Sequence, residues 1–226
     1  MTYSTMISLI VCYLLGALPV GWIIVWLTKK RDIRYYASGR MGTSNVIRMV
    51  GIAAGLLTLA LDFTKGYLAV QVVRAINPNA GTWVEAIGGF LAVLGHVFSI
   101  FLIEKRRNGK YYLRGGAGGA TSLGVAVGIW PPIIFWIGIP AILIYLAIGY
   151  ASIATLSINL LAIIIFSVKE IFSIEPHSSW YIVYAVLTLM LVTYTLRPNL
   201  RRLMRGEERV MKFSLHARLK QKKEQQ

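Results

Sequence analysis

Long runs of hydrophobic residues, separated by shorter polar segments, follow one another along most of the chain. Most runs are close to the roughly 17 to 25 residues that an α-helix needs to cross the hydrocarbon core of a bilayer. The pattern predicts seven helices, which cover residues 6–28, 52–76, 83–103, 116–135, 137–152, 153–172 and 180–196. A count of five or six is the alternative, because Pro131, Pro132 and Pro140 interrupt a long apolar stretch that has almost no charge to mark its turns.

The composition supports an all-α, polytopic membrane protein. Hydrophobic residues make up 56% of the 226 residues, and the mean hydropathy is +0.62. The helices therefore account for nearly the whole chain and leave no room for a separate soluble domain. We expect one transmembrane domain over residues 1–200 and a basic cytoplasmic tail over residues 201–226. The first run is too long for a cleaved signal peptide, and Gly16, Pro19 and Gly21 are spread along it, so we expect it to be retained.

The basic residues predict the orientation of the chain. Lys and Arg number 24 against 9 Asp and Glu, and 21 of the 24 fall in segments 29–51, 104–114 and 197–226. Cytoplasmic segments of membrane proteins are enriched in Lys and Arg, so we expect the amino terminus outside and the carboxyl terminus in the cytoplasm. The same side chains attract anionic lipids, by about 1 kcal/mol each near the surface. Nucleic acid is not an expected partner, because no groove-reading or base-stacking element accompanies the charge.

Metal and thiol chemistry find no support in the sequence. Cys12 is the one cysteine and lies within a hydrophobic run. His96, His177 and His216 show no spacing typical of metal ligands. We therefore expect no metal site.

The polar segment 36–51 stands between two hydrophobic runs, where a short connector would suffice. It contains Ser38, Asn45 and Arg48 together with three glycines. Polar groups are costly to hold against a bilayer, and backbone N–H groups at a helix start bind anions. A polar or anionic ligand at the membrane surface is the first hypothesis for this segment.

A glycine-rich segment, 114–124, opens the fourth predicted helix, and residues 95–98 close the third. Free backbone N–H groups and the helix dipole would favour an oxyanion such as phosphate at this helix start. Close helix packing is the commoner explanation of such glycines in membrane proteins and stays as the alternative. We interpret His96 as a polar packing residue at a helix end rather than as a base.

Two further polar groups have structural and functional interpretations. Residues 197–208 follow the last hydrophobic run and, by themselves, are typical of a basic anchor beside the membrane. Asp62 and Lys65 are an oppositely charged pair inside a predicted span, three residues apart on one helical face. Charges at that depth indicate a functional site, and an ion pair that joins two helices is an alternative of equal weight.

Taken together and in this order, these segments resemble the PlsY family of membrane acyltransferases. Residues 38–48 are similar to the family's GSGNIGATNVxR, and residues 62–66 to its DxxKG. Residues 95–102 with 114–121 are similar to GHxFPxFLxFKGGKGVAT, and residues 199–208 to NIxRLxxGxE. The resemblance covers nearly the whole chain. Four ordered matches are far more specific than any one of them.

The resemblance implies a seven-helix enzyme of the bacterial cell membrane that transfers a fatty acyl group from acyl phosphate to glycerol 3-phosphate, giving lysophosphatidate for phospholipid biosynthesis. It implies no metal or organic cofactor. On this interpretation Ser38 orients the reacting groups, Arg48 neutralises phosphate, Asn45 fixes the loop and Asn199 completes the catalytic group. The residues expected to bind substrate phosphate are Arg114, Gly115, Gly116, Gly118 and Thr121. The residues expected to support the site are Asp62, Lys65, His96, Arg202 and Glu208.

The chain departs from the family pattern at several places. Ala117 and Leu196 stand where the family has a lysine and a histidine, Arg40 stands at the asparagine of GSGN, and about nine additional, partly basic residues precede Arg114. Arg40, Arg197 and the inserted residues are candidates to supply replacement charge. The alternative function is therefore a PlsY-like protein that has lost catalysis and serves as a lipid-binding or structural subunit of a membrane complex with an unknown partner. A transporter is a distant third, because the predicted helices show no inverted repeat.

Overall fold

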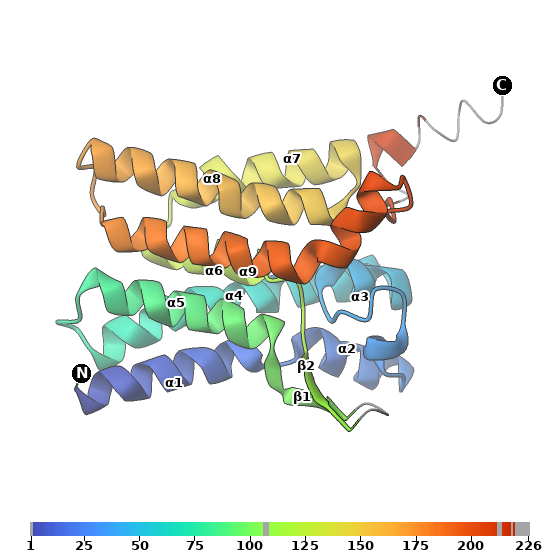
Figure 1. Cartoon of the computed structure of the whole chain (residues 1–226), viewed down its shortest axis with the longest axis horizontal. Helices are drawn as coiled ribbons and strands as arrows, with labels where there is room; N and C mark the ends of the chain where they lie inside the picture. Colours follow the sequence, from blue (N-terminus) through green and yellow to red (C-terminus); the bar gives the residue numbers. More distant parts are fainter. Residues whose placement is uncertain (1, 106–108, 212–213, 218, 220–226) are drawn as a thin grey trace.

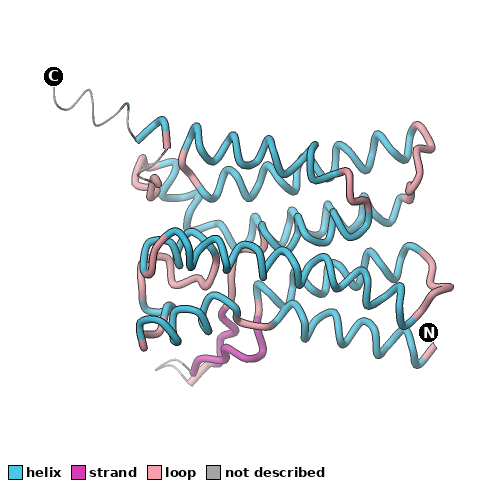
Figure 2. Tube along the Cα trace, turned by 180° about the vertical axis from the view of Figure 1, so that it is seen from behind, coloured by secondary structure: helices cyan, strands magenta, loops and turns pink. Residues whose placement is uncertain are grey.

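The structure, a computed structural model, describes residues 2–105, 109–211, 214–217 and 219. Long helices lie side by side along the long axis of the molecule, and the start of α1 and the end of α9 lie at opposite ends of the bundle (Figure 1). Strands are confined to one small hairpin beside the helices (Figure 2). The helices are α1 (Tyr3–Ala17), α2 (Val20–Lys29), the 3-10 helix η1 (Ile33–Tyr35), α3 (Thr43–Met49), α4 (Ile52–Ile76), α5 (Thr82–Val97), α6 (Gly119–Ile129), the π-helix η2 (Ile134–Gly138), α7 (Ile139–Ile148), α8 (Ala151–Ile171) and α9 (Ser179–Met204). The strands are β1 (Ser99–Lys105) and β2 (Tyr111–Arg114).

The expectation of a mostly helical, multi-pass membrane protein is confirmed. Four helical segments of the described residues are long and apolar enough to cross a membrane: Tyr3–Lys29, Ile52–Ile76, Ala151–Ile171 and Ser179–Met204. Three shorter apolar helices cover Thr82–Val97, Gly119–Ile129 and Ile134–Ile148.

The first predicted helix, 6–28, is in fact two helices. The helical backbone ends at Leu18, whose ψ of 119° is extended, and restarts after Pro19. A proline disfavours helical backbone in the residue before it and cannot donate a hydrogen bond, which explains the break. The carbonyl of Leu18 accepts a hydrogen bond from the Lys65 ammonium at 3.0 Å. The break therefore supplies an acceptor for a charge that lies inside the bundle.

The third predicted helix, 83–103, is also wrong at its end. Helix α5 stops at Val97, and β1 pairs with β2 in an antiparallel hairpin in which Ile103 lies opposite Leu113. The apolar run from Ile100 to Ile103 continues the hydrophobic pattern of the helix, so periodicity did not distinguish strand from helix. The segment before Arg114 that carries the additional residues lies in this hairpin; residues 106–108 are outside the described residues.

Between 116 and 172 the prolines and glycines place the helix ends differently from the prediction. Helix α6 ends at Ile129, just before the Pro131-Pro132 turn, and a π-helical turn runs on into α7, which holds Pro140 in its first turn. Gly149, with a φ of +80°, ends α7 and separates it from α8. The predicted boundaries at 135 and 152 were therefore wrong, because the turn at Pro131 and Pro132 ends α6 earlier and Gly149 ends α7 earlier.

The polar segment 30–51 folds as a compact cap on one end of the bundle. It contains η1 and α3, which the hydrophobic pattern did not predict. Ile33, Met41 and Val46 are almost fully buried beneath it, and a Cβ on Gly21 of α2 would overlap the Met41 carbonyl. This packing fixes the loop against α2 and α4, so its polar side chains are held in defined positions.

Helices α4 and α6 approach each other closely at two glycines. A Cβ on Gly66 would overlap the Thr121 carbonyl, and a Cβ on Gly124 would overlap the Phe63 carbonyl. Small residues at such crossings allow backbones to approach, as is typical of membrane helices. The contact brings the start of α6 beside Asp62 of α4, at the same end of the bundle as α3.

Candidate active site

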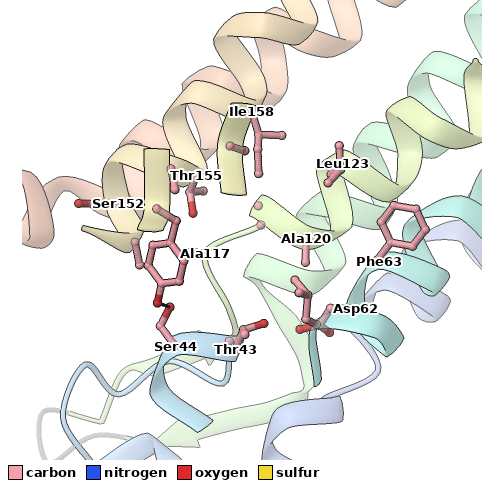
Figure 3. Close-up of a pocket in the computed structure, with 18 of the residues that line it drawn as sticks. Thr43, Ser44, Asp62, Phe63, Ala117, Ala120, Leu123, Ser152, Thr155 and Ile158 are labelled. Atoms are coloured by element: carbon pink, nitrogen blue, oxygen red, sulfur yellow. Dashed lines mark hydrogen bonds between the residues drawn. The ribbon is translucent and has the colours of Figure 1, made fainter. Parts of the chain in front are cut away.

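A cavity of about 560 Å³ lies at this end of the bundle. Its wall combines side chains from the cap, including α3, with residues of α4, α5, α6, η2, α7, α8 and α9 and with Glu208 and Arg209, which follow α9. Figure 3 shows Thr43 and Ser44 on one side, Asp62 and Phe63 from α4 on another, and Thr155 and Ile158 from α8 across from them. Most of the wall is apolar, with Leu56, Leu59, Phe63, Leu123, Ile139, Ile142 and Ile158 among its members. The polar groups gather where the cap closes the cavity.

Asn45 holds the cap in its folded shape. It is 2% exposed, and its side-chain nitrogen donates to the carbonyls of Tyr36 and Arg40 at 3.1 and 2.8 Å. These two bonds assign the amide orientation. Its side-chain oxygen, also buried, has no hydrogen-bond partner among the described residues. Ser38, which also lines the cavity, accepts a long 3.4 Å bond from the Arg40 backbone N–H.

Arg40 connects the cap to α9. Its Nη1 donates to Asn199 Oδ1 at 2.8 Å, and its Nη2 donates to the carbonyl of Thr195. Asn199 in turn donates to Glu208 at 2.6 Å, and the other oxygen of Glu208 lies 3.8 Å from Arg202 Nε. Burial, followed by the nearby charge of Arg202, lowers the pKa of Arg40 to about 10, which leaves it protonated at neutral pH.

Arg48 lines another part of the polar wall. Its guanidinium donates to the carbonyl of Arg209 at 3.4 Å, and burial lowers its pKa. Close by, the hydroxyls of Ser44 and Tyr145 lie 3.0 Å apart and join α3 to α7. The backbone N–H of Met211 donates to the carbonyl of Gly149 at 3.0 Å. The segment after α9 is thereby held over the cavity.

Asp62, Lys65 and His96 form a buried cluster behind this wall, each at most 3% exposed. Lys65 Nζ lies 2.8 Å from Asp62 Oδ1, and His96 Nδ1 lies 3.5 Å from the same oxygen. Lys65 also donates to Leu18 at the break between α1 and α2. The pair therefore joins α4 to two other parts of the bundle. Asp62 and His96 reach the cavity wall, whereas Lys65 does not.

The glycine-rich segment divides into two parts. A Cβ on Gly115 would overlap carbonyls at the end of α5, a Cβ on Gly116 would overlap the His96 ring, and the Gly116 N–H donates to the His96 carbonyl at 2.9 Å. These two glycines therefore allow the chain to cross α5. Gly118, with a φ of +100°, and Gly119 instead line the cavity at the start of α6. The hydroxyl of Thr121 is buried and has no partner among the described residues.

The structure thus brings only part of the predicted set to the cavity. Ser38, Asn45, Arg48, Asn199, Gly118, Asp62, His96 and Glu208 line it. Arg114, Gly115, Gly116, Thr121, Lys65 and Arg202 do not belong to its lining. Arg114 pairs with Glu104 across the hairpin at 2.8 Å, and its guanidinium lies beside Gly39 of the cap.

Several lining residues were not among the predicted site residues. Arg40 was considered only as a replacement charge, whereas Thr43, Ser44, Tyr145, Ser152 and Thr155 were not considered individually. Thr43 and Ser44 lie in the polar segment 36–51, which the sequence already indicated as a ligand-binding segment. Tyr145 lies inside an apolar run, and nothing in the sequence marks it as a site residue. Ala117 and Leu196, the two departures from the family pattern, both line the cavity. The described residues hold no group of three His, Cys, Asp or Glu placed to bind a metal.

A large apolar cavity, closed at one end by arginines, amides and hydroxyls, defines a membrane protein suited to an amphipathic molecule with an anionic head. The chain belongs to the glycerol-3-phosphate acyltransferase family, whose model matches residues 6–206. A glycerol-3-phosphate acyltransferase of Dehalococcoides mccartyi is 34% identical over 90% of this chain and 94% of its own. One of Halalkalibacterium halodurans is 31% identical over 87% of this chain and 90% of its own.

Solved structures agree with this assignment. The chain is similar to PlsY, an integral membrane glycerol 3-phosphate acyltransferase, in its glycerol 3-phosphate form, with a TM-score of 0.79 and 29% identity over 92% of this chain and 96% of that one. The lysophosphatidic acid form of PlsY gives a TM-score of 0.77 and 28% identity, over 93% and 96% of the two chains. The resemblance inferred from the sequence motifs is thereby confirmed at the level of family and fold.

Proposed function

We propose that this chain is a membrane acyltransferase that transfers a fatty acyl group from acyl phosphate to glycerol 3-phosphate and releases lysophosphatidate. The observation that carries the proposal is the division of one cavity into an apolar wall and a polar end with Arg40 and Arg48. An acyl chain matches the first, and a phosphate matches the second. The names of the relatives support the same reaction class.

The reaction asks little covalent chemistry of the protein. Acyl phosphate is a mixed anhydride and is already activated. A hydroxyl of glycerol 3-phosphate attacks the carbonyl carbon, the bond from that carbon to the phosphate oxygen breaks, and the hydroxyl proton ends on the departing phosphate. The site therefore has to hold two phosphates, orient the hydroxyl and stabilise the developing negative charge.

We assign roles to the predicted residues in that scheme. Ser38 orients the reacting groups, Asn45 fixes the cap that carries them, and Arg48 neutralises phosphate. Asn199 completes the group by linking the cap to α9, with Glu208 and Arg202 behind it. The predicted phosphate cradle of Arg114, Gly115, Gly116, Gly118 and Thr121 stays a prediction, in which Gly118 is the member that lines the cavity.

The expected topology is part of the proposal. Four long and three shorter apolar helices would cross the membrane seven times, with the amino terminus outside and the site at the cytoplasmic face of the cell membrane. A cysteine placed at Asn79 should then react with an impermeant thiol reagent added outside intact cells, whereas one at Lys110 should not. Cys12 is buried and serves as the unlabelled background. The reverse labelling pattern would overturn the orientation.

The domain division and the lipid partners also remain proposals. The proposed boundary at residue 200 falls within α9, which continues to Met204. Anionic lipids are the partners expected for the basic residues after α9 and in the hairpin.

The alternative of a lapsed enzyme is not favoured by the relatives named above, which carry the name glycerol-3-phosphate acyltransferase. Purified protein in detergent, supplied with acyl phosphate and labelled glycerol 3-phosphate, should form labelled lysophosphatidate, and product should be lost when either substrate is omitted. A monodisperse, cooperatively unfolding protein that forms no product would overturn the proposed function and favour the structural-subunit alternative.

A further inference from the structure

Arg40 is a partly buried cation whose partners in the structure are neutral. Its guanidinium donates hydrogen bonds to the side-chain oxygen of Asn199 and to the backbone carbonyl of Thr195. Within the described part of the chain, no carboxylate lies within ion-pair distance of it. Burial of a charge is costly. Burial and the nearby charge of Arg202 together lower the pKa of Arg40 to about 10, although the carboxylate of Glu208 acts in the opposite direction. A bound anion would offset that cost.

The geometry of the guanidinium leaves donors for such an anion. Arginine carries about five N–H donors in a planar fork that suits phosphate oxygens. Two of these donors are engaged by α9, and the described residues accept no others. Arg40 lines the cavity, as do Ala117 and Leu196, which carry no charge. Arg40 and Arg48 are therefore the partly buried cations of this wall, while Arg209 is exposed.

An unsatisfied acceptor in the same cap, the side-chain oxygen of Asn45, points to a ligand that also has a hydroxyl. The Asn45 nitrogen is used by two carbonyls, one of them that of Arg40 itself. This leaves the buried Asn45 oxygen as an acceptor without a partner among the described residues. A buried oxygen without a donor is costly. A hydroxyl of a bound ligand would satisfy it. Glycerol 3-phosphate has both a phosphate and hydroxyl donors.

We propose that Arg40 is a substrate-binding residue that holds the phosphate of a phosphate monoester through the donors that α9 leaves free, beside the Asn45 oxygen. The inference rests on the proposed function for the identity of the substrate. The phosphate could belong to glycerol 3-phosphate or to acyl phosphate, and the kinetic test below distinguishes the two.

The test compares Arg40→Gln, Arg40→Lys and Arg197→Gln in purified protein. Glutamine can still donate to Asn199 or Thr195 but has no charge, so it separates anion binding from the structural link. Arg197 was the other candidate replacement charge, but it is exposed, lies outside the cavity lining and stacks on Tyr194, 4.6 Å from the ring centroid. It therefore serves as the matched control. Thermal unfolding is measured with and without inorganic phosphate and glycerol 3-phosphate, followed by KM for each substrate.

We expect Arg40→Gln to lose the stabilisation that phosphate gives to the parent and to raise KM for one of the two substrates by about ten to a hundredfold. The substrate whose KM rises is the one that Arg40 binds. Arg40→Lys should recover part of the affinity, and Arg197→Gln should match the parent. An Arg40→Gln variant that melts earlier but keeps the phosphate response and both KM values would overturn the inference and leave Arg40 a structural link. If the parent makes no lysophosphatidate yet its phosphate response depends on Arg40, the proposed function fails while the anion site stands.

Discussion

Arg40 and Arg74 are both partly buried arginines, but they differ in what satisfies them. Arg74, in the last turn of α4, donates to both oxygens of Glu85 at 2.8 and 3.0 Å, and Tyr181 donates to the same carboxylate. It also donates to the carbonyl of Gly128 at 3.0 Å. Arg40 has two neutral acceptors and faces a cavity. The first is a closed cluster that joins helices, whereas the second keeps donors available for a ligand.

The contrast shows why a charge inside a membrane protein is not by itself a sign of function. The sequence leaves two equal alternatives for Asp62 and Lys65, a functional site and an ion pair that joins helices. The structure gives the pair features of both. Its charges compensate each other at 2.8 Å and join α4 to the break after α1, while Asp62 also reaches the cavity. A cluster that binds a ligand keeps hydrogen-bond donors or acceptors unused, whereas a cluster that joins helices uses them. The presence of charged residues does not distinguish the two.

The largest effect is expected from Arg48→Ala, which removes the other partly buried arginine of the cavity wall. Removing a charged hydrogen-bond donor to a phosphate should raise KM for a phosphate-bearing substrate by about ten to a hundredfold. Steady-state kinetics with each substrate varied in turn measure the effect. Because the hydrogen bond that the Arg48 guanidinium donates to the carbonyl of Arg209 is long, at 3.4 Å, the melting temperature should change little. Parental kinetics would mean that the polar wall around α3 is structural.

Ser38→Ala tests the same wall at a neutral side chain. The serine oxygen accepts one long backbone bond, so its loss should cost little stability. Turnover should fall by about tenfold if the hydroxyl orients the reacting groups, and KM should change less. Ser157→Ala, on α8 and outside the cavity lining, is the control. An unchanged kcat for Ser38→Ala would remove this residue from the proposed catalytic group.

The double change Ala117→Lys with Leu196→His restores to the cavity wall the lysine and the histidine of the family pattern. In an active parent, Arg40 and Arg48 already supply positive charge, so an added lysine should crowd like charges and lower kcat/KM by a few fold. The assay is acyl transfer by parent and variant side by side. A clear rise in activity from a near-background parent would show instead that the present arginines do not replace the missing residues.

The smallest kinetic effect is expected at the closed cluster. Glu85→Gln removes the charge that compensates Arg74 and should lower the free energy of unfolding by about 1 kcal/mol, because the Arg74 side chain is 40% exposed and solvent screens the pair. Chemical or thermal unfolding in detergent measures the loss. Both KM values should match the parent. A KM change as large as that of Arg48→Ala would abolish the distinction between the two clusters.

The sequence predicted the membrane class and the family and drew attention to the polar segment 36–51, because hydrophobic length and ordered motifs are local features. Three features depended on tertiary structure. Helix α5 ends at Val97, but the apolar residues from Ile100 to Ile103 continue the hydrophobic pattern, so the hairpin strand looked helical. Pro19 ends α1 and leaves the carbonyl of Leu18 free to accept from Lys65, which lies 47 positions away in the sequence. Tyr145 reaches Ser44 only because α7 packs over the cap. Hydrophobic periodicity contains none of these pairings.

The break between α1 and α2 bears on how the protein is made. A lysine entering the bilayer needs an acceptor early, since its charge is costly there. The carbonyl of Leu18 belongs to a segment that leaves the ribosome before α4, whereas His96 follows later in synthesis. Asp62 enters with Lys65 on the same helix. Both partners of this lysine, the carboxylate of Asp62 and the carbonyl of Leu18, have therefore been synthesised by the time α4 is complete, so the pairing requires no segment that follows α4.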